Sequence, residues 1–158
     1  MNTADPAHGL SITAIEDGDV AELIALWQRC GNARPWNDPA ADIALARKGS
    51  SSTVLVGRHD GTVAASVLVG HDGHRGWVYY VASDPDHRFK GFGRAMMTAA
   101  EEWLHARGIE KMQLMVRPDN SQVQAFYESL GYFEQKRISM PNGSTAASRL
   151  PDLSGRHA

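Results

Sequence analysis

The stretch Val78-Tyr-Tyr-Val-Ala-Ser-Asp-Pro-Asp-His-Arg-Phe-Lys-Gly-Phe-Gly-Arg-Ala-Met-Met-Thr-Ala-Ala100 joins a predicted strand to a predicted helix. Apolar, β-branched and aromatic residues from Trp77 to Ala82 indicate a buried strand. After it, apolar residues recur at helical spacing from Phe92 to Leu104, which predicts an amphipathic helix. The connection between the two elements is therefore the first place to look for a functional site.

That connection is basic and rich in glycine. It reads Arg88-x-x-Gly91-x-Gly93, with Lys90 and Arg94 interleaved. Glycine lets the backbone come close to a ligand, and the first N–H groups of a helix are unpaired at the positive end of its dipole. Cations in the same segment strengthen that field. The sequence therefore predicts a phosphate or pyrophosphate site.

Two well-known phosphate loops do not fit this segment. The nucleoside-triphosphate loop, Gly-x-x-x-x-Gly-Lys-Ser/Thr, occurs nowhere in the sequence. The dinucleotide fingerprint needs a glycine directly after the strand and a third glycine where Met96 stands. What remains is Arg/Gln-x-x-Gly-x-Gly. On this hexapeptide alone, a basic loop that enters an ordinary helix stays an open alternative.

Length and composition limit the classes of function. A chain of 158 residues predicts one domain with a substantial core. The net charge of −2 gives no electrostatic case for a nucleic-acid or membrane partner. Without a membrane-length apolar run or signal-peptide features, we expect a cytoplasmic protein. The single cysteine, Cys30, predicts a buried structural thiol, and the histidines lack the paired spacing of metal ligands, so no metal site is expected.

The order of the predicted elements indicates the fold class. We expect residues 1–9 to be a flexible leader, residues 10–140 a single domain, and residues 141–158 a mobile tail. A three-strand meander followed by a β-α-β crossover implies a mixed sheet with helices on both faces, an α/β (α+β) fold. The domain is predicted as strand 10–15, helices that begin near Asp17 or Asp19 and at Asp38, strands 53–58, 63–69 and 77–82, helix 92–104, strand 111–116, helix 121–130 and strand 132–140.

This order of elements, together with two local strings, resembles the GNAT superfamily of N-acetyltransferases over about residues 10–140. Asp84-Pro-Asp-His-Arg-Phe-Lys-Gly-Phe-Gly-Arg94 resembles the family's cofactor loop. Asn120 with Phe126-Tyr-Glu-Ser-Leu-Gly-Tyr132 resembles the helix that follows it, and Arg34-Pro-Trp-Asn-Asp-Pro39 resembles a subgroup of small bacterial members with unassigned acceptors. The resemblance implies a mostly antiparallel sheet whose central parallel strand pair is splayed to admit acetyl-coenzyme A.

The resemblance also implies which residues hold acetyl-coenzyme A. The end of the central strand would line the gap between the splayed strands, where a backbone N–H binds the thioester oxygen, and the glycine loop would bind the pyrophosphate. The residues implied are Val81, Ala82, Ser83, Arg88, Phe89, Lys90, Gly91, Phe92, Gly93, Arg94, Asn120 and Phe126.

The sequence indicates a candidate general acid but does not single out a general base. Tyr127 matches the family's tyrosine that protonates the leaving sulfur. The alternative is a purely structural role, as a core aromatic residue on an amphipathic helix. The two positions at which family members place a basic glutamate are Trp77 and Met115 here. The general base therefore stays open among Asp38, His71, Asp72, His74 and a water relayed by Tyr79 or Tyr80.

The loop between the first two helices lies over the acceptor in the resembled family. An arginine in it would favour an acceptor that bears a carboxylate or phosphate. Trp36 would form a pocket wall or, equally, fill the core beneath the helices. The acceptor-side candidates are Arg34, Trp36, Asp38, His71 and Tyr79.

Two classes of function follow. The favoured hypothesis is an acetyl-coenzyme A-dependent N-acetyltransferase that acts on the primary amine of a small molecule, such as an amino acid or derivative, with a peptide or protein amine as the alternative. The other class is a non-catalytic acyl-coenzyme A-binding module, which the missing glutamates would favour. The oligomeric state is not determined by the sequence, and a homodimer is left open.

Overall fold

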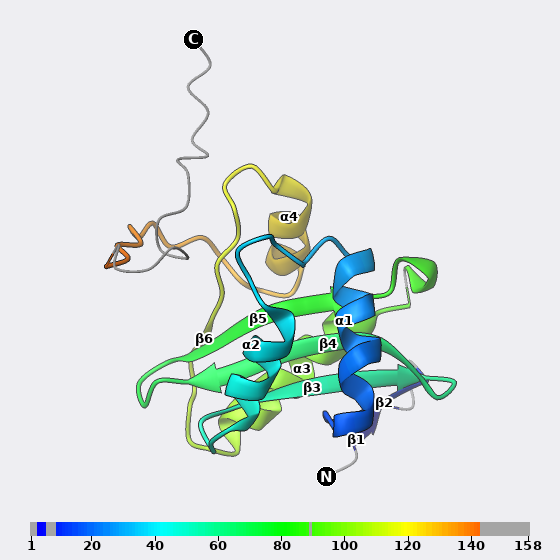
Figure 1. Cartoon of the computed structure of the whole chain (residues 1–158). Helices are drawn as coiled ribbons and strands as arrows, with labels where there is room; N and C mark the ends of the chain where they lie inside the picture. Colours follow the sequence, from blue (N-terminus) through cyan, green and yellow to red (C-terminus); the bar gives the residue numbers. More distant parts are fainter. Residues whose placement is uncertain (1–2, 6–8, 89, 143–158) are drawn as a thin grey trace.

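The computed structural model describes residues 3–5, 9–88 and 90–142. Within them, six strands form one sheet in chain order, and helices cover both of its faces (Figure 1). The predicted mixed α/β class is confirmed. The strands are β1 Thr3–Asp5, β2 Leu10–Ala14, β3 Ser52–His59, β4 Thr62–His71, β5 Gly76–Ser83 and β6 Met112–Gln113. The helices are η1 Asp17–Asp19, α1 Val20–Arg29, α2 Pro39–Arg47, η2 Pro85–His87, α3 Phe92–His105 and α4 Ser121–Ser129.

The sheet opens beside β5. Strands β1 to β5 pair antiparallel, whereas β5 and β6 pair in parallel. That parallel ladder joins only Gly76 to Met112 and Trp77 to Gln113, and β5 then continues to Ser83. The predicted splayed parallel pair is therefore confirmed.

Two apolar cores hold the layers together, one on each face of the sheet. Helices α1 and α2 cover one face and α3 covers the other (Figure 1). A Cβ added at Gly76 would lie 2.3 Å from Leu104 Cδ1, so α3 packs directly against the start of β5. Glycine at this position lets helix and strand approach beside the parallel pair. The strand that opens the sheet is thus fixed at its first residue.

Short local signals in the sequence specify several element ends correctly. The Asp38 carboxylate accepts the Ala41 N–H at 3.1 Å and caps α2, with Pro39 at the first helical position as predicted. In the β3–β4 turn, Asp60 and Gly61 have φ values of 51° and 78°, as a tight hairpin turn requires.

Two features at the ends of the domain were not foreseen. Within the segment expected as a flexible leader, Thr3–Asp5 forms β1 and pairs with β2. Residues 132–140 do not form a strand. A strand needs a neighbouring ladder, and β6, the edge strand, is only two residues long. The predicted tail falls mostly on residues 143–158, outside the described residues.

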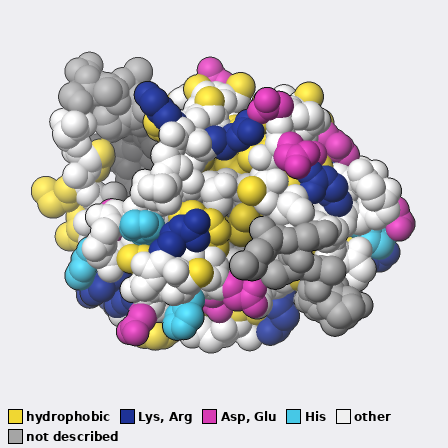
Figure 2. Space-filling view, turned by 90° about the horizontal axis from the view of Figure 1, so that it is seen from below, with side chains coloured by type: hydrophobic (Ala, Val, Ile, Leu, Met, Phe, Trp, Pro, Cys, Tyr) yellow, Lys and Arg dark blue, Asp and Glu magenta, His cyan; other side chains and the backbone are white. Residues whose placement is uncertain are grey.

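The face of the protein shown in Figure 2 is not dominated by charges of one sign. Acidic and basic side chains are interspersed across that face, as expected for a net charge of −2. No helix in the described part of the chain is both long and apolar enough to span a bilayer.

Candidate active site

The glycine loop ends in a left-handed residue at the start of α3. Gly91 is the N-cap of α3 with φ 74° and ψ 18°, a conformation that side chains with a Cβ adopt at a cost. The first turn of α3 carries no acidic residue, and Arg88, Lys90 and Arg94 are exposed around it. Unpaired helix N–H groups beside three cations fit a pyrophosphate. Phe89 lies outside the described residues.

Two of the predicted loop residues contribute to packing. The Phe92 side chain is buried in the core beneath α3, so only its backbone N–H can face a ligand. A Cβ at Gly93 would lie 3.1 Å from Phe126 Cζ, because α4 packs against the first turn of α3 here. The second glycine of the motif therefore brings together the two strings that resemble the GNAT family.

Asp84 anchors the loop to the body of the protein. It is 6% exposed, and its carboxylate accepts the Asp86 N–H at 3.0 Å and Arg29 Nη2 at 2.9 Å. Burial raises the pKa of Asp84, but the Asp86 hydrogen bond and the Arg29 charge outweigh it and lower the pKa overall. This role of Asp84 was not predicted from the sequence. An Asp-Pro pair before a short helical turn was the available signal.

Asp84→Asn should lower the free energy of unfolding by roughly 1–3 kcal/mol at neutral pH, because Arg29 loses its charged partner while the cap on η2 stays. A lowered folded-state pKa contributes stability above the unfolded pKa of about 4 and loses it below. The difference from the parent should therefore shrink toward about pH 3. Urea unfolding at both pH values checks this, with Asp86→Asn as the exposed control. A difference that does not change with pH would contradict the role of the charge.

Tyr127 lies on α4 between two other aromatic rings. Its ring is 5.1 Å from that of Phe126 and 6.1 Å from that of Tyr132, and it packs against the core under α3. Burial raises the pKa of Tyr127 to about 12. The phenol is therefore protonated at neutral pH, as a general acid must be, but it is a weaker acid than an ordinary tyrosine. Asn120 Oδ1 accepts the Val123 N–H at 3.2 Å, so it caps α4 and leaves its amide NH₂ for other partners.

Side chains bind the backbone of β5 where β6 no longer accompanies it. The hydroxyl of Ser66 donates to Tyr80 O at 2.9 Å, and Asn32 Nδ2 donates to Val81 O at 3.3 Å. The thiol of Cys30 donates to Ser83 O at 3.3 Å, and burial raises its pKa, which agrees with the predicted structural role.

Tyr80 forms a bulge at the same place. Ser66 faces Ala82 and Leu68 faces Tyr79, so two β5 residues lie opposite one β4 residue. Tyr80 has φ 51°, unusual for a residue with a side chain. Its ring stacks on Trp27 at 3.9 Å, and Trp27 Nε1 donates to Ser66 Oγ at 2.8 Å. This buried cluster fixes the backbone direction of β5 at the opening.

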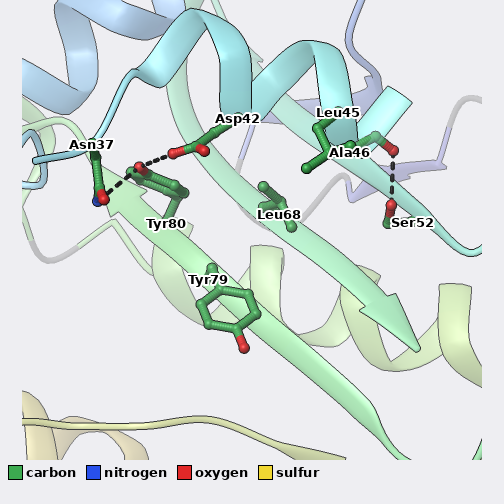
Figure 3. Close-up of a pocket in the computed structure, with 8 residues that line it drawn as sticks. All are labelled: Asn37, Asp42, Leu45, Ala46, Ser52, Leu68, Tyr79 and Tyr80. Atoms are coloured by element: carbon green, nitrogen blue, oxygen red, sulfur yellow. Dashed lines mark hydrogen bonds between the residues drawn. The ribbon is translucent and has the colours of Figure 1, made fainter. Parts of the chain in front are cut away.

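Two adjoining pockets lie along this part of β5 on the α1–α2 side. Their volumes are about 460 and about 350 Å³, and both are lined by Asn37, Tyr79 and Tyr80. The larger pocket is also lined by Asp42, Leu45, Ala46, Ser52 and Leu68 (Figure 3). The smaller is also lined by Asn32, Arg34, Val81 and Met115.

The structure brings together only some of the predicted acceptor residues. Arg34 and Tyr79 line the pockets, but Asp38 is used as the α2 cap, and Trp36 is not among the lining residues. His71 also lies outside both pockets, where its Nδ1 accepts the Gly73 N–H at 3.1 Å. Trp36 and Asp38 were expected at the acceptor because their loop covers it in the resembled family, and His71 because it was a candidate base.

Asp72 is engaged in its own turn. Its carboxylate accepts the Arg75 N–H at 2.7 Å and the His74 N–H at 2.9 Å, and these bonds lower its pKa to about 2. It is therefore a poor proton acceptor. Of the two positions where family members carry glutamate, Met115 lines the smaller pocket, whereas Trp77 Nε1 faces Asp72 at 3.3 Å.

Asp42 was missed by the sequence analysis. Its Oδ2 accepts the Tyr80 hydroxyl at 2.6 Å, and the same hydroxyl accepts Asn37 Nδ2 at 3.3 Å (Figure 3). The available signal was the spacing Asp38-x-x-x-Asp42, one helical turn, which puts a second carboxylate on α2 after the cap.

Comparisons with known proteins agree with this geometry. The model of the Acetyltransferase (GNAT) family matches residues 20–132. An acetyltransferase of Yersinia pestis (strain Pestoides F) is 40% identical over 131 residues, which cover 83% of this chain and 93% of that protein. An acetyltransferase of Sodalis glossinidius is 40% identical over 129 residues, covering 82% and 91% respectively.

Solved structures share the fold. The ribosomal-protein-S18-alanine N-acetyltransferase of Escherichia coli has a TM-score of 0.69 at 28% identity and covers 80% of this chain and 79% of its own. The aminoglycoside N-acetyltransferase AAC(6')-Iy in complex with a bisubstrate analogue has a TM-score of 0.73 at 16% identity, and the match covers 84% of this chain and 96% of that one. The chain is an acyltransferase that uses acetyl-coenzyme A, and it belongs to the GNAT acetyltransferase family.

Proposed function

We propose that this enzyme transfers the acetyl group of acetyl-coenzyme A to the primary amine of a small molecule. The observation that carries the proposal is the course of β5. After it leaves β6, the strand passes two pockets on the α1–α2 side and then runs directly into the basic glycine loop. An acceptor and a pyrophosphate can therefore be held on one continuous segment of chain.

Acetyl-coenzyme A supplies an acyl group that is activated as a thioester. In our proposal, the N–H groups at the start of α3 and the cations Arg88, Lys90 and Arg94 hold its pyrophosphate. The backbone of residues 81–83 lines the opening, and Tyr127 donates a proton to the departing sulfur. The raised pKa of Tyr127 keeps the phenol protonated before the reaction, but it also makes proton transfer to a thiolate uphill, because a thiol has a pKa near 8.5.

A peptide or protein amine is the second candidate acceptor. It is favoured by the 28% identity to an enzyme that is named a ribosomal-protein-S18-alanine N-acetyltransferase. The small-molecule candidate is favoured by the size of the larger pocket, about 460 Å³, which falls in the range of small-molecule sites.

Release of the coenzyme A thiol, measured across a panel of amines, separates the two candidates. The panel pairs amino acids and monoamines with peptides that end in a free α-amine. We expect amine-dependent thiol release with small amines at lower concentrations than with peptides. Saturation by peptides alone would move the proposal to the second candidate.

Arg34→Ala should raise the KM for amines that carry a carboxylate and leave that for their uncharged amides nearly unchanged. A guanidinium can bind a carboxylate through two parallel hydrogen bonds, which the amide cannot replace. We expect a loss of about 1.5–3 kcal/mol for one charged hydrogen-bonded contact. Steady-state kinetics with an amino acid and its amide make the comparison. Equal effects on both acceptors would show that Arg34 only supports the loop.

A further inference from the structure

The hydroxyl of Tyr80 is held at the junction of the two pockets. The backbone of Tyr80 has a left-handed φ of 51°, a conformation that costs about 1–3 kcal/mol for a residue with a side chain. The Trp27 stack and the Ser66 hydrogen bond hold it there. Strain that is maintained by a buried cluster is common at functional sites, so this hydroxyl is a candidate for a role beyond packing.

The hydrogen bonds of that hydroxyl leave room for a ligand. It donates its single proton to Asp42 at 2.6 Å and accepts one hydrogen bond from Asn37 at 3.3 Å. A phenol oxygen has a further lone pair, which can accept a proton donor from the pocket. The short distance to Asp42 is typical of a hydrogen bond to an ionised carboxylate.

We propose that Asp42 and Tyr80 form the subsite that binds the ammonium group of the acceptor and removes its proton. This inference rests on the proposed transfer to an amine. The ammonium N–H gives its proton to the Tyr80 oxygen while the Tyr80 hydroxyl proton passes to Asp42. The amine becomes neutral, Asp42 becomes a neutral carboxylic acid, and Tyr80 is unchanged.

This proton transfer supplies the general base that the sequence did not identify. An ordinary alkylamine with a pKa near 10.4 is neutral to only about one part in a thousand at pH 7, so its proton needs a destination. Neither Trp77 nor Met115 can accept it, and Asp72 is engaged in its turn. Asp42 is the one carboxylate among the described residues that line the two pockets.

The composition of the larger pocket narrows the class of acceptor. Leu45, Ala46 and Leu68 provide apolar walls beside the single carboxylate. A polycation would need several anionic partners, whereas one ammonium on an apolar body matches one carboxylate and these walls. The acceptor class that fits is a monoamine with a compact apolar group.

Binding of two matched probes tests the ammonium subsite without any turnover. Benzylamine is a cation at neutral pH, and benzyl alcohol offers the same ring without charge. Calorimetry on the coenzyme A-saturated protein should show that Asp42→Asn weakens benzylamine binding by about tenfold to a hundredfold and leaves benzyl alcohol unchanged. Asn still accepts the Tyr80 hydroxyl, so the pocket keeps its shape.

Asp17→Asn is the matched control. This substitution also removes one carboxylate next to α2, because Asp17 accepts a hydrogen bond from Arg47 of α2 at 2.8 Å. Asp17, however, lies outside both pockets. Equal losses in Asp42→Asn and Asp17→Asn would overturn the subsite. So would a parent that shows no benzylamine binding or no preference for the amine over the alcohol.

A pH profile tests removal of the proton. With benzylamine as acceptor, the rate of Asp42→Asn relative to the parent should recover toward high pH, by about tenfold per pH unit, as free amine replaces the missing proton acceptor. The other titratable groups that line the pockets are Arg34, Tyr79 and Tyr80. Burial raises the pKa of both tyrosines, and the charge of Asp72 adds to this at Tyr79 as the hydrogen bond to Asp42 does at Tyr80.

A rate that falls equally at every pH would assign Asp42 a structural role and overturn the relay. Failure of the proposed function would look different. In that case no amine would release thiol, whereas the dependence of benzylamine binding on Asp42 would persist.

Discussion

Gly91→Val is expected to weaken coenzyme A binding by a hundredfold or more. The residue has φ 74° at the N-cap of α3, and a β-branched side chain there costs about 1–3 kcal/mol in backbone strain alone. Its side chain would also project where the pyrophosphate must approach the helix N–H groups. Backbone strain and the steric block both disturb the loop that binds the pyrophosphate. We therefore expect Gly91→Val to lose coenzyme A binding while the protein stays folded. Calorimetry with coenzyme A measures the affinity directly.

Gly108→Val provides the control for fold stability. Gly108 follows the other end of α3 with φ 77°, and a Cβ there would meet no atom within 4 Å. Gly108→Val introduces comparable backbone strain just after the C-terminal end of α3, away from the glycine loop. The two variants should lose comparable stability, and only Gly91→Val should lose coenzyme A. If both bind coenzyme A as the parent does, the loop is not the pyrophosphate site.

Tyr127→Phe is expected to lower turnover by about a hundredfold to ten-thousandfold, the usual contribution of a general acid. The substitution keeps the ring contacts with Phe126 and Tyr132 and removes only the proton donor. Coenzyme A affinity and the unfolding midpoint should therefore stay close to those of the parent. Pre-steady-state measurement of thiol release isolates the chemical step from product release.

The alternative interpretation of Tyr127 predicts the opposite outcome. If Tyr127 is only a core aromatic residue, its hydroxyl contributes nothing to the chemistry, and the rate of the chemical step is unchanged. The raised pKa has a further consequence, since the phenol keeps its proton up to about pH 12. Loss of the acid by ionisation should therefore not appear in the accessible alkaline range.

The strand–loop–helix unit was predictable because its signals are local. The apolar run of β5, the glycine at 91 and the helical period of α3 each act within a few residues. The same holds for the Asp38-Pro39 cap and the Asp60-Gly61 turn. Resemblance to the GNAT family then supplied the correct pairing of β5 with β6.

The bulge and the ammonium subsite could not be predicted because they depend on distant contacts. Trp27 and Ser66 are 39 residues apart, and Tyr80 and Asp42 are 38 residues apart. In the sequence, Ser66 looks like a small residue in an apolar strand, and Asp42 looks like a solvated helix residue. Only the packing of α1 on β4 and β5, and of α2 on α1 and β3, gives these side chains a common site.

The prediction of a strand over residues 132–140 failed for a related reason. Its aromatic and β-branched residues give it local strand character, but a strand also needs a neighbour with free backbone groups. β6 is too short to provide a ladder, and Phe133 and Ile138 remain 74% and 88% exposed. Partner availability therefore overrode local propensity.

Acetyl transfer to an amine is tested most directly by thiol release from acetyl-coenzyme A in the presence and absence of a primary monoamine, with the product identified by mass spectrometry. We expect release that depends on the amine and yields one N-acetylated product per thiol. Release at the same rate without amine, or coenzyme A binding with no release for any amine, would contradict acetyl transfer to an amine.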